Sequence, residues 1–495
     1  MLARLWSRAY ATGLLPLAAV AVAFMAVVLA SSPLRMSFGW DEAVYASQIS
    51  QHHPLMPWGA ERARGMPLLT APVAMLTTSV LALRVYLAVL AGAGLFLAFA
   101  AWRSLRPPRV LVLAAALFGG LWTTQLYAPL VFPNLWTAFG AVASLGLFLR
   151  ALRKTSPGVL VMLGVAVAFT GLMRPVDAAA LCLPMAVTVI AKAGHHASRA
   201  LIALIGGLVI AFGEWAAEAF AYFGGPTGRL REVGRAGGGS HFSPWNSLRI
   251  ISGGNDSSIA VPGIHATHGW NYPWLLLWWA AFAVLAILGT WLAHRSQGVL
   301  IAALPLACAL VIYLLYSFPV RDNVRYMLPA WALISVPAAD GLTWLYQETR
   351  GRVRVLAAAA AVAFVGVELI YGHAILARQA NGLAALSATN ERAAALLAKE
   401  GVHPPCVVTS GPGPFAVVSE PAAFDSGCSY QWSLRHLYQA KGRQIVVIMD
   451  GNGLPWSYAV AWRPHRLWGL NGLVSYVEPP PHHYSHHRHH HRKRR

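Results

Sequence analysis

Residues 38–46 read FGWDEAVYA and follow shortly after the first long apolar segment of the chain, residues 14–30. They place two adjacent carboxylates, Asp41 and Glu42, beside a membrane in a chain with only 18 acidic residues among 495. Acidic side chains near a helix N-terminus stabilise the helix dipole. A carboxylate in such a place can also take a proton from a reacting hydroxyl. Position alone leaves both interpretations open, and the surrounding chain bears on the choice.

The composition is that of a protein with many membrane spans. Hydrophobic residues make up 57% of the chain and charged residues 11%, whereas soluble domains carry about 25% charged residues. The formal net charge is +20, but the basic residues lie mainly in short clusters between apolar segments and at the C-terminal end. This is the positive-inside pattern of membrane proteins. It argues against a nucleic-acid partner and makes the lipid bilayer the partner of the spans.

Eleven spans are expected. We interpret the first, residues 14–30, as a signal anchor whose flanking Arg4 and Arg8 keep the N-terminus in the cytoplasm. Residues 67–80 are apolar but too short to cross, and they predict a helix beside the membrane. The other ten spans are 84–102, 110–126, 133–150, 158–173, 176–191, 200–223, 272–293, 299–318, 326–346 and 353–376. This order leaves five basic loops inside a multi-pass plasma-membrane protein: 103–109, 150–154, 192–199, 294–295 and 350–354.

The membrane domain is therefore expected to be residues 1–376, with a first outer loop at 31–66 and a long outer loop at 224–270. Residues 377–478 predict a small α/β domain, since strand-like runs at 406–409 and 444–450 alternate with a helical pattern. An odd number of spans puts this domain outside the cytoplasm. There Cys406 and Cys428 are expected to form a disulfide, two free thiols being the alternative. Residues 479–495 form a His- and Arg-rich tail that predicts disorder.

Several arginines face outward against the positive-inside trend, and they make an extracellular anion the natural partner. Arg321 and Arg325 are four residues apart, which puts them on one face of a helical start, and Arg174 lies in a short outer turn. The guanidinium fork suits phosphate, so these three are candidates to bind a donor phosphate. Snorkelling to the membrane interface is the alternative for Arg321 and Arg325. Glu218, in the seventh span, is open to catalysis or to pairing with an arginine.

Three motifs carry a family resemblance: DEAVYA at 41–46, RGMPLL at 64–69 and RYMLPA at 325–330. With the order of spans, they resemble the GT-C glycosyltransferases, in particular the protein O-mannosyltransferase, aminoarabinose-transferase and RgtA/B/C/D-like group. The resemblance covers about residues 1–376. The outer domain is similar only in kind to those of actinobacterial cell-wall glycosyltransferases. The expected fold is an α-helical, polytopic GT-C-like membrane domain with a small extracytoplasmic α/β domain.

The resemblance implies an inverting enzyme that moves a sugar from a polyprenyl-phosphate donor to a polysaccharide, lipid or protein acceptor of the cell envelope. Asp41 would be the base, and Glu42 its neighbour in the acceptor or metal site. Arg325 would bind the donor phosphate. Contacts to the acceptor or the sugar are expected from Tyr45, Asn134 and His241.

Asn134 is a departure from the family, because many members have a second Asp at this point. An amide can hydrogen-bond a hydroxyl, but it cannot neutralise a metal ion. The sequence therefore predicts no metal ligands, and a divalent metal is the one cofactor that it leaves open.

Two other classes of protein are also compatible with many spans and intramembrane charge. A transporter or flippase for a lipid-linked sugar should show inverted repeats and broken helices in matching halves, and we find no such symmetry. A non-catalytic scaffold that binds cell-wall polymer through its outer domain is the other class. The residues do not identify the sugar or the acceptor.

Overall fold

The computed structural model describes residues 13–50, 53–192, 194–236, 273–297, 299–317, 324–410, 416–431, 443–450, 464–467 and 472–479, with positions 457, 459, 460 and 462. The chain forms two compact units. Unit 1 comprises residues 1–52 and 58–388, and unit 2 comprises residues 53–57 and 389–495. Most of the long outer loop and all but the first residue of the predicted tail lie outside the described residues.

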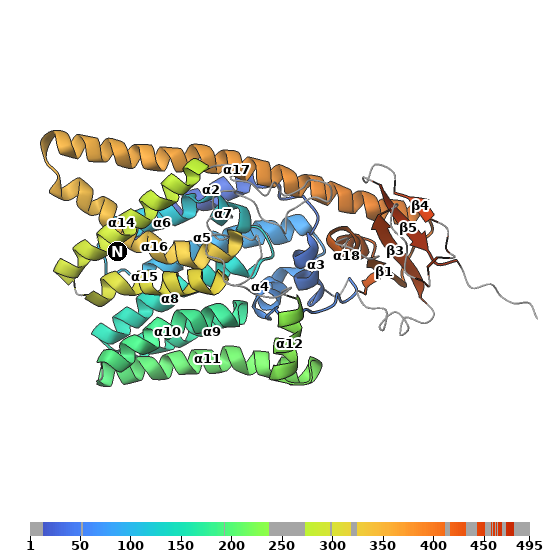
Figure 1. Ribbon diagram of the computed structural model, residues 1–495, viewed down its shortest axis with the longest axis horizontal. Helices are drawn as coiled ribbons and strands as arrows, with labels where there is room; N and C mark the ends of the chain where they lie inside the picture. The colour runs from blue at the N-terminus through green and yellow to red at the C-terminus, as the bar shows by residue number, and fades with distance from the viewer. Residues whose placement is uncertain are drawn as a thin grey trace, which may run out of the picture. The chain divides into compact units, whose positions relative to one another are not determined.

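Unit 1 is built from α-helices (Figure 1). Each of the eleven predicted spans coincides with one helix or with two consecutive helices. These are α2 Leu14–Ser31, α5 Val80–Ala100, α6 Pro108–Gly120 with α7 Trp122–Tyr127, α8 Pro133–Arg153, α9 Pro157–Met173, α10 Pro175–Lys192, α11 His195–Tyr222, α14 Pro273–Gln297, α15 Val299–Tyr316, α16 Leu328–Glu348 and α17 Gly351–Lys399. The last of them, α17, continues into unit 2.

Six helices of the described chain are long and apolar enough to cross a membrane: α2, α5, α8, α10, α11 and α17. Helices α6 and α9 are apolar but shorter, as are Leu276–Leu292 of α14 and Ala303–Tyr316 of α15. The most apolar windows of α2 and α11 are each only 22% buried inside the protein, whereas that of α8 is 83% buried. Apolar surface exposed on this scale is stable in lipid and not in water. The chain is a multi-pass membrane protein with α8 in its core.

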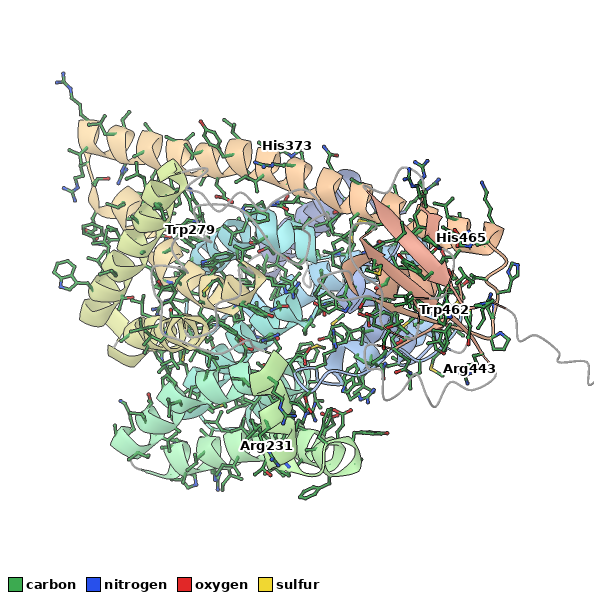
Figure 2. The ribbon with its side chains drawn as sticks, turned by 45° about the vertical axis from the view of Figure 1, so that its right-hand side comes forward. Arg231, Trp279, His373, Arg443, Trp462 and His465 are labelled. Carbon is green, nitrogen blue, oxygen red and sulfur yellow. A yellow bond between two sulfur atoms is a disulfide. The ribbon has the colours of Figure 1, made fainter. Side chains whose placement is uncertain are left out.

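Close approach between helices depends on small residues. A side chain at Gly289 of α14 would collide with the carbonyl of Pro337 in α16. Membrane helices pack through such small residues because lipid supplies no hydrophobic force between helices. On the same two helices, Trp279, labelled in Figure 2, stacks on Trp331 with ring centroids 4.4 Å apart. The result is a tight α14–α16 pair within unit 1.

Between α2 and α5 the chain forms two short helices, α3 Trp40–Ser47 and α4 Gly65–Ala74. Helix α4 covers the first part of the apolar helix expected at 67–80, but it ends at Ala74, and Val80 already belongs to α5. A Cβ at Gly65 would lie 2.6 Å from the carbonyl oxygen of Leu172, at the end of α9. This close approach brings the end of the first outer loop next to the turn that carries Arg174.

Unit 2 contains a five-stranded sheet in the order β2-β1-β3-β5-β4. Strand β1 is parallel to β2 and β3, whereas β5 is antiparallel to β3 and β4. The strands are β1 Cys406–Ser410, β2 Ser429–Tyr430, β3 Gln444–Asp450, β4 Pro464–Arg466 and β5 Leu473–Val477, and helix α18 Ala416–Asp425 packs against β1. Strands β1 and β3 fall on the two predicted runs, so the small α/β domain is confirmed.

Unit 2 has an apolar core and a disulfide, of which the disulfide was expected from the sequence. Val447, Met449 and Tyr476 belong to a buried apolar cluster, and Trp462 packs against it (Figure 2). Cys406 and Cys428 form the expected disulfide, with Cα atoms 4.8 Å apart. The bond ties the start of β1 to the residue before β2.

Candidate functional site

Asp41 lies between two guanidinium groups. Its Oδ1 accepts a hydrogen bond of 2.8 Å from Nη2 of Arg62, and its Oδ2 accepts one of 3.1 Å from Nη2 of Arg325. Asp41 lies in the first turn of α3, Arg62 lies between α3 and α4, and Arg325 belongs to the 3-10 helix η2 Val324–Met327. The Asp41 side chain keeps 22% of its surface exposed, whereas both arginine side chains are 7% exposed. Three segments distant in sequence thus meet at one carboxylate.

The charge state of Asp41 follows from these contacts. Burial raises the pKa of the carboxyl, but Arg62 and Arg325 lower it by more, through their charges and hydrogen bonds, so that the pKa lies below its ordinary value. Asp41 is therefore an ionised hydrogen-bond acceptor at neutral pH. Each contact engages one nitrogen of a guanidinium that carries five N–H donors.

Glu42, the next residue, has different surroundings. Its side chain is 2% exposed and forms a two-point ion pair with Arg84, which is fully buried, at 2.9 and 3.1 Å. The same carboxylate accepts hydrogen bonds from the backbone N–H groups of Val131, at 2.9 Å, and Gly39, at 3.0 Å. Glu42 thus caps α3 and ties it to α5 and to the 127–132 loop. Its lone pairs are directed at protein donors.

Arg174 is held by an acid and a phenol. Its Nε donates to Oδ2 of Asp177 at 2.7 Å, and its Nη2 donates to the hydroxyl oxygen of Tyr316 at 2.9 Å. The Tyr316 hydroxyl in turn donates to the same Asp177 oxygen at 2.6 Å. Two partners on one side of the guanidinium fix its plane.

The ring of Tyr326 links Arg174 to Arg325. The guanidinium carbon of Arg174 lies 4.7 Å from the ring centroid and that of Arg325 lies 5.4 Å from it. The ring of Tyr316 stacks on Tyr326 at 4.9 Å. The two distances from a guanidinium carbon to the Tyr326 ring fall within the range of cation–π attraction. Two of the three arginines that the sequence proposes for a phosphate are therefore neighbours, and the third, Arg321, lies outside the described residues.

Tyr45 and Asn134 are both buried. The Tyr45 ring lies edge-on to Trp58, with centroids 5.8 Å apart, and Arg62 lies over it at 5.9 Å. Burial raises the pKa of the Tyr45 phenol, which keeps it protonated and able to donate. Asn134, in the first turn of α8, is 1% exposed, and neither atom of its amide has a hydrogen-bond partner in the described chain. His241 lies outside the described residues.

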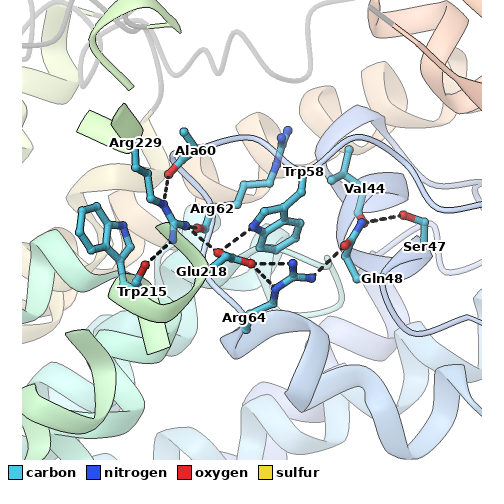
Figure 3. Close-up of polar contacts among 10 residues, drawn as sticks. All are labelled: Val44, Ser47, Gln48, Trp58, Ala60, Arg62, Arg64, Trp215, Glu218 and Arg229. Atoms are coloured by element: carbon cyan, nitrogen blue, oxygen red, sulfur yellow. Dashed lines mark hydrogen bonds and ion pairs between the residues drawn. The ribbon is translucent and has the colours of Figure 1, made fainter. Parts of the chain in front are cut away.

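Glu218 is the centre of a hydrogen-bond network that includes Trp58, Arg64 and Arg229 (Figure 3). Its Oε1 accepts from Nε of Arg64 at 2.6 Å, and its Oε2 accepts from the indole of Trp58 at 3.0 Å and pairs with Arg229 at 2.8 Å. Arg229 is fully buried and also donates to the carbonyl oxygens of Ala60 and Arg62. The network holds the backbone of Arg62, and so the position of a partner of Asp41. Pairing with arginine is the alternative that the structure favours for Glu218.

Four residues of the site were not singled out from the sequence. Arg62 and Arg84 look like ordinary interfacial basic residues, and Tyr316 looks like an aromatic residue at the end of a span. Asp177 carried the one usable signal, because an acid inside an apolar segment is costly and is functional by default.

The carboxylates of Asp41 and Glu42 are engaged by arginines, and they do not form a set of metal ligands. Within the ranges that the structure describes, no three His, Cys, Asp or Glu residues gather as they would around an ion.

Comparison with known proteins identifies the fold. No protein-family model matches the chain, and no curated protein matches it. Solved structures do match, and they have the fold of the GT-C glycosyltransferases, so the chain has the GT-C fold that its sequence predicts. One is ArnT from Cupriavidus metallidurans bound to undecaprenyl phosphate, with 14% identity over 92% of this chain and 97% of that one and a TM-score of 0.61.

Two solved structures of the Archaeoglobus fulgidus oligosaccharyltransferase also match the chain. Its complex with Zn and sulfate has 12% identity, coverage of 87% of this chain and 68% of that one, and a TM-score of 0.55. Its complex with an inhibitory peptide and a dolichol-phosphate has 12% identity, coverage of 87% and 69%, and a TM-score of 0.50. At these identities the likeness establishes the fold.

Proposed function

We propose that the protein is an inverting glycosyltransferase that moves a sugar from a polyprenyl-phosphate donor to a cell-envelope acceptor on the outer face of the plasma membrane. The observation that carries the proposal is the arrangement around Asp41. An ionised carboxylate, partly exposed, contacts Arg325, and Arg325 shares the ring of Tyr326 with Arg174. A base and two cations are the groups that transfer from a phosphate-linked sugar requires.

The donor class draws support from the fold. Two proteins with this fold were solved with a polyprenyl phosphate, undecaprenyl phosphate in ArnT and dolichol-phosphate in the oligosaccharyltransferase. Arg62 is shared by two acids, Asp41 and Glu61, so Arg174 and Arg325 are the cations proposed for the phosphate. Two guanidinium groups favour a phosphate that becomes more negative as its bond to the sugar breaks.

In the proposed reaction the acceptor hydroxyl attacks the anomeric carbon from the side opposite to the phosphate. A new carbon–oxygen bond forms, the old bond to phosphate breaks, and the electron pair leaves with the polyprenyl phosphate. The hydroxyl proton passes to Asp41. Because the pKa of Asp41 is lowered, it is a weak base. It therefore orients the hydroxyl first and takes the proton once bond formation has made the hydroxyl acidic.

Arg325 and Arg174 neutralise the departing phosphate. Guanidinium groups bind phosphate oxygens in a two-point geometry, and donors that are already oriented cost no reorganisation when charge develops. Arg174 meets this condition through Asp177 and Tyr316. Arg321 remains a predicted third cation.

The remaining predicted residues take supporting roles. Glu42 positions α3, since its carboxylate is taken up by Arg84 and two backbone amides. Asn134, with an amide that has no partner in the described chain, is proposed to hydrogen-bond a hydroxyl of the acceptor or the sugar. Tyr45 is likewise proposed to contact the acceptor or the sugar, and the same role for His241 stays a prediction.

The test is transfer by purified protein from synthetic polyprenyl-phosphate sugars. Asp41→Asn should lower the rate by about 10²- to 10⁴-fold, the usual contribution of a general base, in protein that is expressed and still folded at the assay temperature. The matched control is Glu232→Gln, which removes one carboxylate charge from an exposed pair with Arg235 and should leave the rate unchanged. Wild-type transfer by Asp41→Asn would refute the assignment of the base.

A further inference from the structure

Asp177 has one carboxylate oxygen that the arrangement described above does not use. The residue lies in the first turn of α10 and is 2% exposed. Its Oδ2 accepts hydrogen bonds from both Arg174 and Tyr316. Its Oδ1 is buried and has no hydrogen-bond partner in the part of the chain that the structure describes. All the hydrogen bonds that Asp177 accepts from the described residues therefore fall on one oxygen.

A buried carboxylate oxygen without a donor is costly and uncommon, because it has given up water without a replacement. The helix dipole of α10 stabilises the negative charge of an acid in the first turn. It does not supply a donor to Oδ1. A ligand that brings its own hydrogen-bond donor would do so.

The surroundings define the chemistry of that ligand. Asp177 holds Arg174, whose guanidinium lies over the Tyr326 ring that Arg325 also approaches. Oδ1 thus belongs to the same cluster as the cations proposed for the phosphate. A sugar attached to that phosphate presents hydroxyl groups, which are donors, within a few ångströms of it.

We propose that Oδ1 of Asp177 accepts a hydrogen bond from a hydroxyl or ammonium group of the donor's sugar, and that Asp177 is a specificity-determining residue; this rests on the proposed function. The two oxygens of Asp177 have different roles. Oδ2 orients Arg174 for the phosphate, and Oδ1 hydrogen-bonds the sugar that the phosphate carries. A site built to hydrogen-bond a substrate group strongly rejects analogues that lack it, since its own polar atom is then left unpaired.

The experiment compares two ligands of the full-length protein in lipid nanodiscs. One is undecaprenyl phosphate without sugar, and the other is undecaprenyl phosphate that carries mannose, arabinose, galactose or aminoarabinose. The measured quantity is the ratio of the two dissociation constants. Wild-type protein should bind at least one sugar-bearing lipid more tightly than the bare lipid. Asp177→Ala should reduce this preference about tenfold, as expected for a hydrogen bond to a charged group.

Tyr316→Phe is the matched control. It removes the other partner of Arg174 and one hydrogen bond to Oδ2, but it leaves Oδ1 in place. It should weaken both ligands alike and leave their ratio unchanged, which separates reading of the sugar from support of Arg174. If Asp177→Ala does not fold, Asp177→Asn, which keeps the volume and loses the charge, should shift the ratio in the same direction.

An unchanged ratio in the folded Asp177 variants would overturn the inference, and so would a wild-type protein that prefers none of the four sugars to the bare lipid. Both results leave the proposed function standing, provided that wild-type protein binds undecaprenyl phosphate. If it does not bind this lipid at all, the proposed function fails, and the inference fails with it.

Discussion

The ion pair between Glu42 and Arg84 offers the sharpest test of how the site is held. The two side chains are 2% and 0% exposed and meet at two points. Arg84 also donates to the carbonyl oxygens of Met36, Ser37 and Pro129. The pair therefore joins the approach to α3, the start of α5 and the loop before α8. Removal of either partner leaves a buried group without its counterion.

Breaking a buried ion pair by removing one partner costs about 3–5 kcal/mol. Glu42→Gln keeps the size of the side chain but turns an N–H donor toward the donors of Arg84 and the backbone. Arg84→Gln leaves Glu42 charged and buried. For the roughly 380 residues of unit 1, the size scaling of the unfolding entropy converts this cost into an apparent melting temperature lower by about 4–6 °C. The double variant should lose less than the sum of the two single losses, because two amides can pair.

The assay is thermal unfolding of the purified variants in one detergent, followed by tryptophan fluorescence, with sugar transfer measured below the transition. Glu232→Gln again serves as the control for a lost surface charge. Transfer should fall only in proportion to the fraction unfolded. A Glu42→Gln protein that unfolds like wild type but has lost transfer would refute the structural role and return Glu42 to the chemistry.

Three further predictions test the site and the topology. Arg325→Ala should weaken use of the polyprenyl-phosphate donor by about tenfold or more while the apparent affinity for the acceptor stays the same, because its guanidinium is assigned to the phosphate; an unchanged donor KM would remove Arg325 from that role. Arg62 and Arg325 hold the pKa of Asp41 below its ordinary value. As the pH falls, kcat/KM should therefore decrease only below the pH at which an ordinary aspartate is protonated, and Arg62→Ala should shift this decrease to higher pH. A decrease that stays at the same pH in Arg62→Ala would show that another group titrates. A cysteine introduced at 103–109 should be protected from a membrane-impermeant thiol reagent added outside, and labelling there would refute the proposed orientation.

Asp41 and Glu42 are adjacent in sequence but have different roles, because their carboxylates have different partners. Asp41 keeps part of its surface exposed and meets one nitrogen from each of two arginines. Glu42 points to a different face of α3, and its carboxylate is engaged by Arg84 and two backbone amides. Adjacent residues on a helix point about 100° apart, so one side chain can face a site while the next faces the core. The helix-start interpretation fits Glu42, and the chemical interpretation is proposed for Asp41.

The resemblance carried by the motifs at 41–46, 64–69 and 325–330, with the order of spans, was enough to predict the GT-C fold. Hydrophobic run length predicted the helices behind eleven spans, and β-branched runs predicted strands β1 and β3 of unit 2. Each of these depends on local composition: an apolar run long enough to cross lipid becomes a helix, and a β-branched run between turns becomes a strand. Asp41, Arg174 and Arg325 could be proposed for the same reason, since charge at the edge of an apolar span is visible in the sequence.

Tertiary structure decided which charges meet. Arg62 was one of several basic residues in a loop until the Glu218 network placed its backbone, and Asp177 was one acid in an apolar span until Tyr316, 139 residues later, donated to it. Such contacts join side chains from helices that are far apart in sequence, and ion pairs of this kind leave no periodic trace in either segment. The free oxygen of Asp177 is visible only once all of its neighbours are in place, because an unmet hydrogen bond is a property of the packed molecule.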